Sequence, residues 1–300
     1  MTSPPLKLGF IGLGIMGVPM AGHLQNAGHQ LFVHTRGKVR PEIAESRATQ
    51  CVTARGVAER ADVIFLMLPD TPDVEKVLFG ADGVAEGLVP GKLVIDMSSI
   101  SPIATKDFAA RINALGCDYL DAPVSGGEVG AKAASLTIMV GGPDSAFQRA
   151  LPLFQRMGKN ITHIGGNGDG QTTKVANQII VALNIAAVGE ALVFASKAGA
   201  DPAKVREALM GGFAASRILE VHGERMIKRT FGPGFRIGLH QKDLNLALQG
   251  AQTLGVALPQ TAGAAQLMQA CAAQGWGELD HSALVKALEL MSHHTLSDPP

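Results

Sequence analysis

Lys174 and Asn177 stand three residues apart near the start of a long apolar stretch. A lysine ammonium group can donate a proton, and an amide beside it can orient it. The stretch runs without proline from Gln171 to Ala198, which predicts a helix of about 40 Å at 1.5 Å per residue. Because residues three apart share a helix face, the pair should point towards one site. The glycine-rich segment 165–170 before it favours a cleft; a solvated helix start is the alternative, and this stretch alone leaves both open.

A glycine-rich motif follows the first apolar run of the chain. Residues 6–11 (LKLGFI) indicate a buried parallel strand, and a helix is expected over residues 18–27. Between them lies G-x-G-x-x-G, which binds dinucleotides when it joins a strand to a helix. The residues expected to contact the cofactor are Gly12, Leu13, Gly14, Ile15, Met16 and Gly17. The first glycine would allow the tight turn, the second the approach of a pyrophosphate, and the third close helix packing.

The second predicted strand, residues 30–34 (QLFVH), follows at the distance that a dinucleotide site requires, which argues against an accidental glycine turn. Its end bears on the choice of cofactor. NAD sites usually present Asp or Glu there, whereas this chain has Thr35 and Arg36, with Lys38 and Arg40 beyond. A guanidinium at Arg36 suits a 2′-phosphate, so we expect NADP to be favoured over NAD. Solvated loop charges are the alternative.

Further apolar runs with strand character alternate with helical segments. These strands are expected over residues 63–68, 93–97, 119–124 and 136–140, the last of them closing the sheet. The alternation predicts an α/β fold, with an N-terminal Rossmann domain built on a doubly wound, mostly parallel sheet. Ligands of such sheets lie beyond the carboxyl ends of the strands, so Leu68, Pro69, Ser98 and Ser99 should face the cofactor. For Ser98 and Ser99, a helix cap ahead of Pro102 is the alternative.

After residue 170 the sequence indicates helices only. They are expected over residues 171–198, 202–210, 216–229, 242–254, 260–274 and 282–291. Apolar residues cover most of the circumference of the first, which should act as a spine. We therefore expect an NAD(P)-binding Rossmann domain over residues 1–168. An all-helical C-terminal domain for substrate binding and oligomerisation should follow over residues 169–300, joined by the long interdomain helix.

A Ser-Gly-Gly corner, Ser125, Gly126 and Gly127, follows the fifth predicted strand. A hydroxyl and bare backbone N–H groups there can hold a substrate carboxylate as an anion nest. A plain tight turn is the alternative.

Composition narrows the class of partner. The chain has 26 basic and 26 acidic residues, so nothing indicates nucleic acid or an anionic membrane as a partner, and a small molecule is favoured. Three widely spaced cysteines without a C-x-x-C pattern argue against disulfides and a zinc site and fit a reducing cytoplasm. The first apolar run contains too many glycines for a secretory signal, and no later segment approaches the ~20 uninterrupted apolar residues that a membrane span needs.

Taken together, these motifs resemble the β-hydroxyacid dehydrogenase family, of which 3-hydroxyisobutyrate dehydrogenase is a member. The resemblance runs from about residue 6 to residue 291. It rests on FIGLGIMGVPMA, DAPVSGG, GDGQTTKVANQ and HQKDLNLAL. It implies an NAD(P)-dependent oxidoreductase that acts on CH–OH groups of small acids. The stretches VANQIIVALNIAAVGEAL, LMGGFAASRILEVHGERM and DMSSISP look most like members that reduce tartronate semialdehyde (2-hydroxy-3-oxopropionate) to glycerate.

The resemblance also implies roles for individual residues. Lys174 matches the catalytic lysine and Asn177 its amide partner; both would contact the substrate. Ser125, Gly126 and Gly127 match the loop that binds the substrate carboxylate. Ser99 matches a hydroxyl near the nicotinamide, and Lys242 matches a lysine that reaches nicotinamide and substrate. Thr35 stands where many relatives have an acidic residue, and the lack of that acid argues against a preference for NAD.

The implied chemistry agrees with the residues. Hydride addition to an aldehyde leaves a developing alkoxide, which needs a proton donor and a positive charge; Lys174 supplies both, and no metal is required. We expect His240 to be structural and Asp280 to be a helix cap. The alternatives are an enzyme for 3-hydroxyisobutyrate or a related β-hydroxyacid or semialdehyde, and a non-catalytic dinucleotide-binding scaffold. The apolar helical half indicates a homo-oligomer, a dimer or tetramer.

Overall fold

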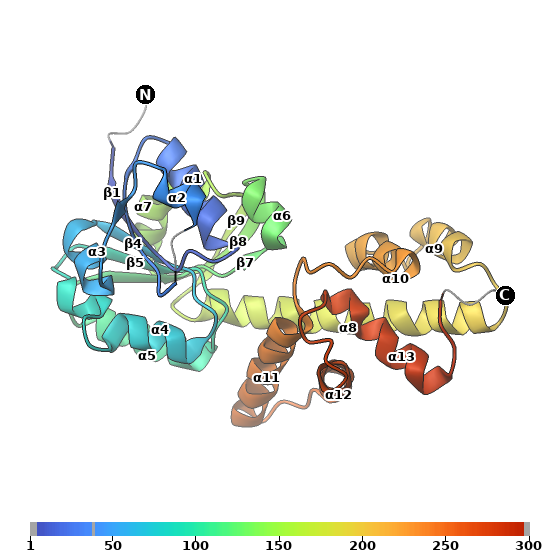
Figure 1. The fold of residues 1–300 in the computed structure, drawn as a ribbon. Coiled ribbons are helices and arrows are strands. Elements are labelled where there is room, and N and C mark those ends of the chain that lie inside the picture. The colour runs from blue at the N-terminus through green and yellow to red at the C-terminus, as the bar shows by residue number, and fades with distance from the viewer. Residues whose placement is uncertain (1–4, 38–39, 297–300) are drawn as a thin grey trace. The chain divides into compact units, whose positions relative to one another are not determined.

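A computed structural model describes residues 5–37 and 40–296 (Figure 1). The chain divides into two compact units, Met1–Lys174 and Val175–Pro300. The first is an α/β unit and the second is helical, as the sequence predicts.

Nine strands form one sheet in the described part of the first unit. They are β1 (Lys7–Ile11), β2 (Gln30–His34), β3 (Thr49–Gln50), β4 (Val63–Leu66), β5 (Leu93–Asp96), β6 (Asp118–Asp121), β7 (Val124–Ser125), β8 (Leu136–Gly141) and β9 (Gly158–Gly165). Their order is β3-β2-β1-β4-β5-β6-β8-β7, and β9 pairs with β8. The first six strands are parallel, whereas β8 runs antiparallel to β6 and β7. The strand order reverses at β1, which pairs with both β2 and β4.

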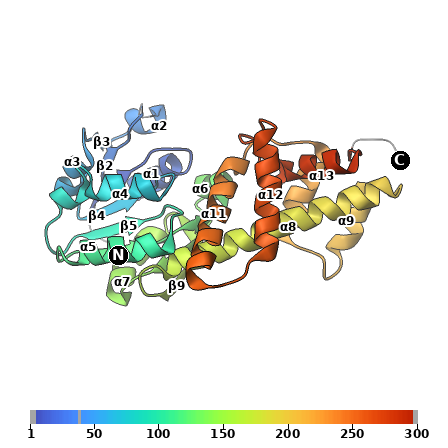
Figure 2. The ribbon, with the colours of Figure 1, turned by 90° about the horizontal axis from the view of Figure 1, so that it is seen from below.

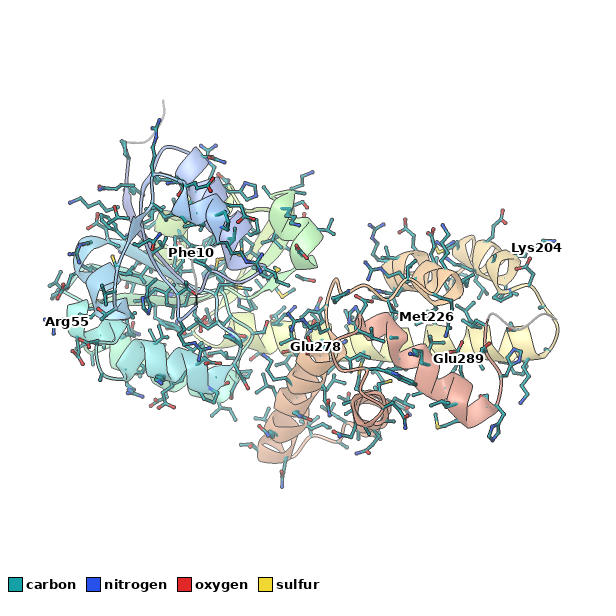
Figure 3. The ribbon with its side chains drawn as sticks, viewed as in Figure 1. Phe10, Arg55, Lys204, Met226, Glu278 and Glu289 are labelled. Carbon is teal, nitrogen blue, oxygen red and sulfur yellow. The ribbon has the colours of Figure 1, made fainter. Side chains whose placement is uncertain are left out.

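Helices cover both faces of this sheet (Figure 1). One face carries α1 (Gly17–Asn26), α2 (Pro41–Ala44), α6 (Gly127–Lys132) and α7 (Asp144–Phe154). The other carries α3 (Ala54–Arg60), α4 (Thr71–Phe79), the 3₁₀ turn η1 (Val84–Gly87) and α5 (Pro102–Asn113). Because both faces are covered, central strands such as β4 are continuously apolar and buried at every residue. Phe10 of β1, labelled in Figure 3, stacks on Phe65 of β4 in this core.

Two details of the sheet differ from the sequence prediction. Residues 136–140 do not form the last strand, because β9 follows and pairs with β8 in parallel. The sequence hides β9 because this edge strand is mostly polar and exposed, so it lacks an apolar run. The single strand expected over residues 119–124 is divided into β6 and β7 by Ala122 and Pro123.

The second unit consists of helices in the residues that the structure describes. They are α8 (Asp169–Lys197, which crosses the division between the units), α9 (Pro202–Met210), the π-helical turn η2 (Leu219–Gly223), α10 (Glu224–Lys228), α11 (Ile237–Leu254), α12 (Pro259–Ala273), the 3₁₀ turn η3 (His281–Leu284) and α13 (Val285–Ser292). Helices α11 and α12 pack together, as Figure 2 shows from below. A core that includes Met226, labelled in Figure 3, joins these helices to α8.

Helix α8 has 29 residues and confirms the predicted long helix. Its most apolar window has a mean hydropathy of 2.1, with 39% of the window buried, so the helix has the length and composition of a membrane span. This measure is a window average that tolerates polar residues, whereas the sequence was expected to lack an uninterrupted apolar run of membrane length. Polar residues such as Gln178 and Glu190 interrupt the apolar sequence of this continuous helix. A core helix of a protein without a membrane meets the same criteria, so one such helix is weak evidence for a span.

Candidate functional site

The carboxyl ends of five neighbouring strands, β2, β1, β4, β5 and β6, lie side by side at one end of the sheet. Ile11 pairs with both His34 and Leu66, Leu66 pairs with Asp96, and Asp96 pairs with Asp121. The segments that follow these residues include the glycine motif, Thr35 and Arg36, Leu68 and Pro69, Ser99, and the Ser-Gly-Gly corner. The fold therefore brings the segments predicted to hold the cofactor to the end where dinucleotides bind in sheets of this kind.

The glycine motif has the geometry of a dinucleotide turn. Gly12 has a φ of +98°, and a Cβ there would lie 2.3 Å from the carbonyl oxygen of Met67. A Cβ on Gly17 would lie 1.9 Å from the Gly12 carbonyl oxygen, so both positions require glycine. At Gly14 a Cβ would meet no atom within 4 Å, so packing within the protein does not require this glycine, and the backbone is open to an approaching group as in a dinucleotide turn. Helix α1 begins here without a side-chain cap, which leaves its first turn suited to an anion.

Arg36 pairs with a carboxylate, Asp73, that is distant from it in the sequence. Its guanidinium lies 2.9 Å from Asp73 of α4, and its side chain is 66% exposed. Thr35 beside it is half-buried. Lys38 lies outside the described residues. An acidic group thus stands near the end of β2 after all, on a different element from the one where dinucleotide sites usually carry it.

The loops after β4 and β5 are bonded to each other. The hydroxyl of Ser98 accepts a hydrogen bond from the backbone N–H of Leu68, at 2.9 Å. The alternative that Ser98 or Ser99 caps α5 is wrong, because Ser101 is the N-cap and accepts from the Ala104 N–H. Ser98 is buried, whereas Ser99 is half-buried. The fold thus leaves Ser99, rather than Ser98, accessible at this end of the sheet.

The Ser-Gly-Gly corner joins β7 to α6. Gly126 and Gly127 have φ values of +130° and +59°, which L-residues with side chains rarely adopt. The corner therefore depends on its glycines, and successive N–H groups in such a turn form a nest for an anion.

Buried hydrogen bonds hold the first turn of α8 to the sheet. The two carboxylate oxygens of Asp121 accept from the backbone N–H groups of Gly168 and Gln171, at 2.8 and 2.9 Å. This carboxylate, at the end of β6, caps the helix from a distant part of the chain and suits the positive end of its dipole. Burial raises the pKa of Asp121, against the two N–H groups that lower it. Its sequence signal was an acid at the end of a buried strand, to which our sequence analysis assigned no role.

A second buried carboxyl, Asp96 at the end of β5, lies in the neighbouring strand. Its oxygens accept from the Ser98 N–H at 2.9 Å and the Tyr119 hydroxyl at 3.1 Å. Complete burial raises its pKa to about 6, although both hydrogen bonds favour the charged form. Asp96 is therefore a group of the first unit that titrates near neutral pH.

Lys174 and Asn177 lie on α8, as predicted. Lys174 is 7% exposed, which excludes a solvated helix start for this side chain. The amide nitrogen of Asn177 donates to Gln178 at 2.8 Å, and Gln178 in turn donates to Asp243 at 2.5 Å. Lys242 lies 3.0 Å from the other oxygen of Asp243, in the geometry of an ion pair rather than an aligned hydrogen bond. A polar chain that is buried at Gln178 and Asp243 therefore links Asn177 to Lys242 within the second unit.

A group of three histidines is the main feature that the sequence analysis missed. His240 is fully buried and bonds to the Gln178 carbonyl and to His281, at 3.1 and 2.9 Å. His281 also lies 3.3 Å from His222. Burial, together with the neighbouring histidines, lowers the pKa of His281 well below its ordinary value. The three histidines come from distant elements without an H-x-x-H spacing, so the sequence pattern could not reveal them.

Asp280 anchors this histidine group and is a helix cap, as predicted. Its oxygens accept from the N–H groups of Ser282, Gly234 and Phe235, and Arg225 lies 2.8 Å away. With His222 and His281 it forms a set of three candidate metal ligands. The bonds to Asp280 already use both its oxygens, so the group is better described as a hydrogen-bonded structural array than as a metal site.

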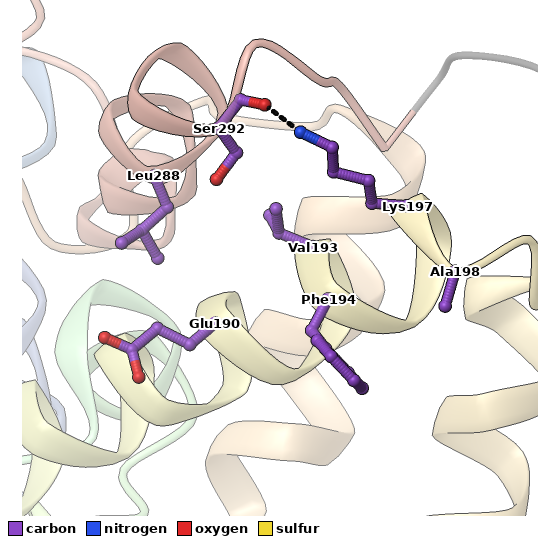
Figure 4. Close-up of a pocket in the computed structure, with 7 residues that line it drawn as sticks. All are labelled: Glu190, Val193, Phe194, Lys197, Ala198, Leu288 and Ser292. Carbon is purple, nitrogen blue, oxygen red and sulfur yellow. Dashed lines mark hydrogen bonds between the residues drawn. The ribbon is translucent and has the colours of Figure 1, made fainter.

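A surface pocket of about 480 Å³ lies elsewhere in the second unit, between α8 and α13 (Figure 4). It is lined by Glu190, Val193, Phe194, Lys197, Ala198, Leu288 and Ser292. Glu190 follows Lys174 by 16 residues, or about 24 Å along the helix. The pocket contains none of the residues predicted to be catalytic.

Comparisons with known proteins cover nearly the whole chain. A family model for the NAD binding domain of 6-phosphogluconate dehydrogenase matches residues 7–165. A second model, for the NAD-binding region of NADP-dependent 3-hydroxyisobutyrate dehydrogenase, matches residues 168–288. The chain is 65% identical to 2-hydroxy-3-oxopropionate reductase of Escherichia coli K12, over 97% of this chain and 100% of that protein.

More distant relatives carry other activities. The chain is 38% identical to 2-(hydroxymethyl)glutarate dehydrogenase of Eubacterium barkeri, over 97% of this chain and 98% of that protein. Among solved structures, it is similar to 3-hydroxyisobutyrate dehydrogenase of Mycobacterium tuberculosis, in a structure named for its combination with L-serine. That match has a TM-score of 0.88 and 32% identity, and covers 95% of this chain and 99% of the other.

Proposed function

We propose that this chain, which belongs to the β-hydroxyacid dehydrogenase family, reduces 2-hydroxy-3-oxopropionate to glycerate, reversibly. It is an NAD(P)-dependent oxidoreductase by its two family matches. The observation that carries the choice of substrate is the 65% identity to the E. coli reductase over the full length of that protein.

We assign the roles as follows. The glycine motif from Gly12 to Gly17 binds the pyrophosphate of the dinucleotide, and the bound nicotinamide supplies the hydride. Lys174 donates a proton to the carbonyl oxygen as the hydride adds to the carbonyl carbon, so that an aldehyde becomes an alcohol. Asn177 orients the substrate and Lys174, and the corner from Ser125 to Gly127 holds the substrate carboxylate. The low exposure of Lys174 supports this assignment, because a charge out of water acts more strongly on a developing alkoxide.

Positioning of the cofactor is assigned to the other residues at the strand ends. Leu68, Pro69 and Ser99 line the nicotinamide half, and Lys242 contacts nicotinamide and substrate. Thr35 and Arg36 contact the adenosine ribose, with NADP favoured over NAD. The exposure of Arg36 supports this preference, because its guanidinium can exchange Asp73 for a 2′-phosphate. An Arg36→Ala variant should raise KM for NADPH while leaving KM for NADH nearly unchanged; an equal effect on both would refute the preference.

Residues 1–168 are proposed as the cofactor domain, residues 169–300 as the substrate and oligomerisation domain, and the cytoplasm as the compartment. A homodimer or tetramer is supported by apolar side chains on the second unit, such as Phe194, which is 77% exposed beside the pocket in Figure 4. Sedimentation of the purified protein as a monomer would contradict this assignment.

The test is the rate of NADPH and NADH oxidation with 2-hydroxy-3-oxopropionate, beside oxidation of 3-hydroxyisobutyrate. Rapid turnover of the aldehyde is expected. A clear preference for 3-hydroxyisobutyrate would overturn the substrate but not the family. Lys174→Ala should lower kcat about 10²-fold to 10⁴-fold while NADPH still binds. Binding of NADPH by the wild type without turnover of any semialdehyde would favour a scaffold.

A further inference from the structure

The side chain of Gln171 brackets Ser99. Its amide oxygen accepts from the backbone N–H of Ile100 at 3.1 Å, and its amide nitrogen donates to the backbone carbonyl of Ser98 at 2.7 Å. These are the peptide groups on either side of Ser99. Gln171 is fully buried, so neither bond competes with water. The loop after β5 is thus held at Ser99 by one side chain from the first turn of α8.

The backbone of Gln171 is held as well. Its N–H donates to Asp121 at 2.9 Å, beside the bond from Gly168 to the other oxygen of the same carboxylate. A Cβ on Gly170 would lie 2.5 Å from the Met139 carbonyl oxygen, so this turn packs tightly on the sheet. The first turn of α8 therefore cannot move relative to the sheet without breaking buried hydrogen bonds of both the backbone and the side chain of Gln171.

We propose that Gln171 is a positioning residue that sets the place of Lys174 relative to Ser99. Lys174 lies three residues further along α8, on the same face of the helix. The link from Ser99 through Gln171 to Lys174 lies entirely within the first unit. This inference rests on the proposed reaction, in which Ser99 adjoins the nicotinamide and Lys174 protonates the carbonyl oxygen. Gln171 touches neither reactant; it fixes the distance between the two groups that do.

An amide is the group that this position demands. Ser98 presents an acceptor and Ile100 a donor, so the side chain must donate with one atom and accept with the other. A carboxylate of the same length would place an acceptor against the Ser98 carbonyl, whereas a protonated carboxylic acid can again donate and accept. Titratable groups near this turn include Asp96 of β5, Tyr119 and Asp121 of β6, Lys106 of α5, and Asp169 and Lys174 of α8. The burial and the three carboxylates raise the pKa of an introduced carboxyl, and the two lysines lower it.

The experiment compares Gln171→Ala and Gln171→Glu with wild type. The matched control is Thr172→Ala, at an exposed neighbour on the same turn. We expect the Ala variant to lose kcat by about 10-fold to 100-fold, with the Kd for NADPH, from fluorescence titration, within about threefold of wild type. The Glu variant should be similarly impaired at pH 8, and its kcat relative to wild type should recover as the pH falls towards 5.5. The control should keep wild-type kcat.

Equal kcat values for the Ala variant and the control would overturn the proposal. So would a Glu variant whose activity relative to wild type does not change with pH. All variants are compared on whichever of the two substrates the wild type turns over. If the wild type does not turn over 2-hydroxy-3-oxopropionate, the proposed substrate is refuted, but the comparison of the variants remains valid. Crystal structures of wild type and the Ala variant give a readout without turnover. The Ser99 loop should move relative to Lys174, and an unmoved loop would also refute the proposal.

Discussion

Replacing Asp280 with Asn would remove one charge from the second unit with little change in shape. Asp280 is fully buried, and its carboxylate accepts from the Ser282 N–H and hydroxyl at 3.1 and 2.6 Å. On its other side it accepts from Gly234 and Phe235 and pairs with Arg225 at 2.8 Å. An amide oxygen can replace only one of these two acceptor sets. The more favourable orientation keeps the second set and turns an NH₂ group towards the Ser282 N–H.

The cost follows from these contacts. A buried N–H without a partner costs about 1–3 kcal/mol. Loss of the counter-ion of Arg225 adds about 1–2 kcal/mol, less than for a fully buried pair, because that guanidinium is 28% exposed. We therefore expect Asp280→Asn to lower the free energy of unfolding by about 3 kcal/mol. With a urea m-value of about 2 kcal/mol/M, the midpoint falls by about 1.5 M.

The assay is urea denaturation followed by tryptophan fluorescence. Trp276 is the single tryptophan of the chain and lies four residues before Asp280 in the second unit, where Lys286 sits over its ring at 3.8 Å. The control is Glu278→Gln, which removes an ion pair to Arg236 from a side chain that is 82% exposed, labelled in Figure 3. This change should leave the midpoint within error of wild type. An Asp280→Asn midpoint equal to that of the control would refute the reasoning.

The difference between wild type and Asp280→Asn should also depend on pH. Burial raises the pKa of Asp280, but His222, His281 and the Ser282 hydroxyl hold it well below its usual value. A depressed carboxyl pKa contributes stability above the unfolded-state pKa of about 4, and that stability is lost as the pH falls through the folded-state pKa. The difference in stability between the two proteins should therefore begin to shrink below about pH 4 and shrink further as the pH falls. A difference that stayed constant down to pH 2 would contradict the role of the charge.

Three further outcomes are expected. The pKa of Asp96, raised to about 6, makes the folded state bind an extra proton between about pH 4 and pH 6, so stability should fall by up to about 3 kcal/mol as the pH rises through this window. The free energy of unfolding of Asp96→Asn, from urea denaturation followed by circular dichroism, should therefore depend less on pH than that of wild type. Glu289→Ala breaks a two-bond ion pair with Arg229, at 2.6 and 2.8 Å. It should lower the free energy of unfolding, measured by the tryptophan assay, by about 2–3 kcal/mol, which is less than for a fully buried pair because Arg229 is 30% exposed. Gly17→Ala forces a Cβ against the Gly12 carbonyl and should weaken NADPH binding at least about tenfold in a fluorescence titration; unchanged binding would show that the turn can relax.

Local patterns predicted most of the fold, because each element carries its own signal. The strand at Gln30–His34 and the helix at Pro202–Met210 have the predicted ends. The helix expected over residues 242–254 begins at Ile237, five residues earlier, and the segment 216–229 contains a π-helical turn before α10. These differences arise because intrinsic propensity is weak at element ends, where tertiary contacts decide.

The candidate site was less predictable, because its supporting contacts join distant parts of the chain. The placement of Lys174 and Asn177 on one helix was predicted from the sequence, whereas their roles were implied by the family resemblance. Asp121 and Gln171 are 50 residues apart, and each looks ordinary in its own segment. Their roles appear only when the end of β6 meets the start of α8. The pairing of Arg36 with Asp73 could not be predicted for the same reason.

The capping of α8 by Asp121 determines where the chain can be cut. A fragment that ended at residue 168, the boundary suggested by sequence, would lack the Gln171 N–H and side chain, and would leave one Asp121 oxygen without its donor. A fragment that began at residue 169 would contain helix α8 without the Asp121 carboxylate that caps its first turn. An autonomously folding first unit must therefore carry the opening turns of α8 at its carboxyl end, beyond the last strand of its sheet.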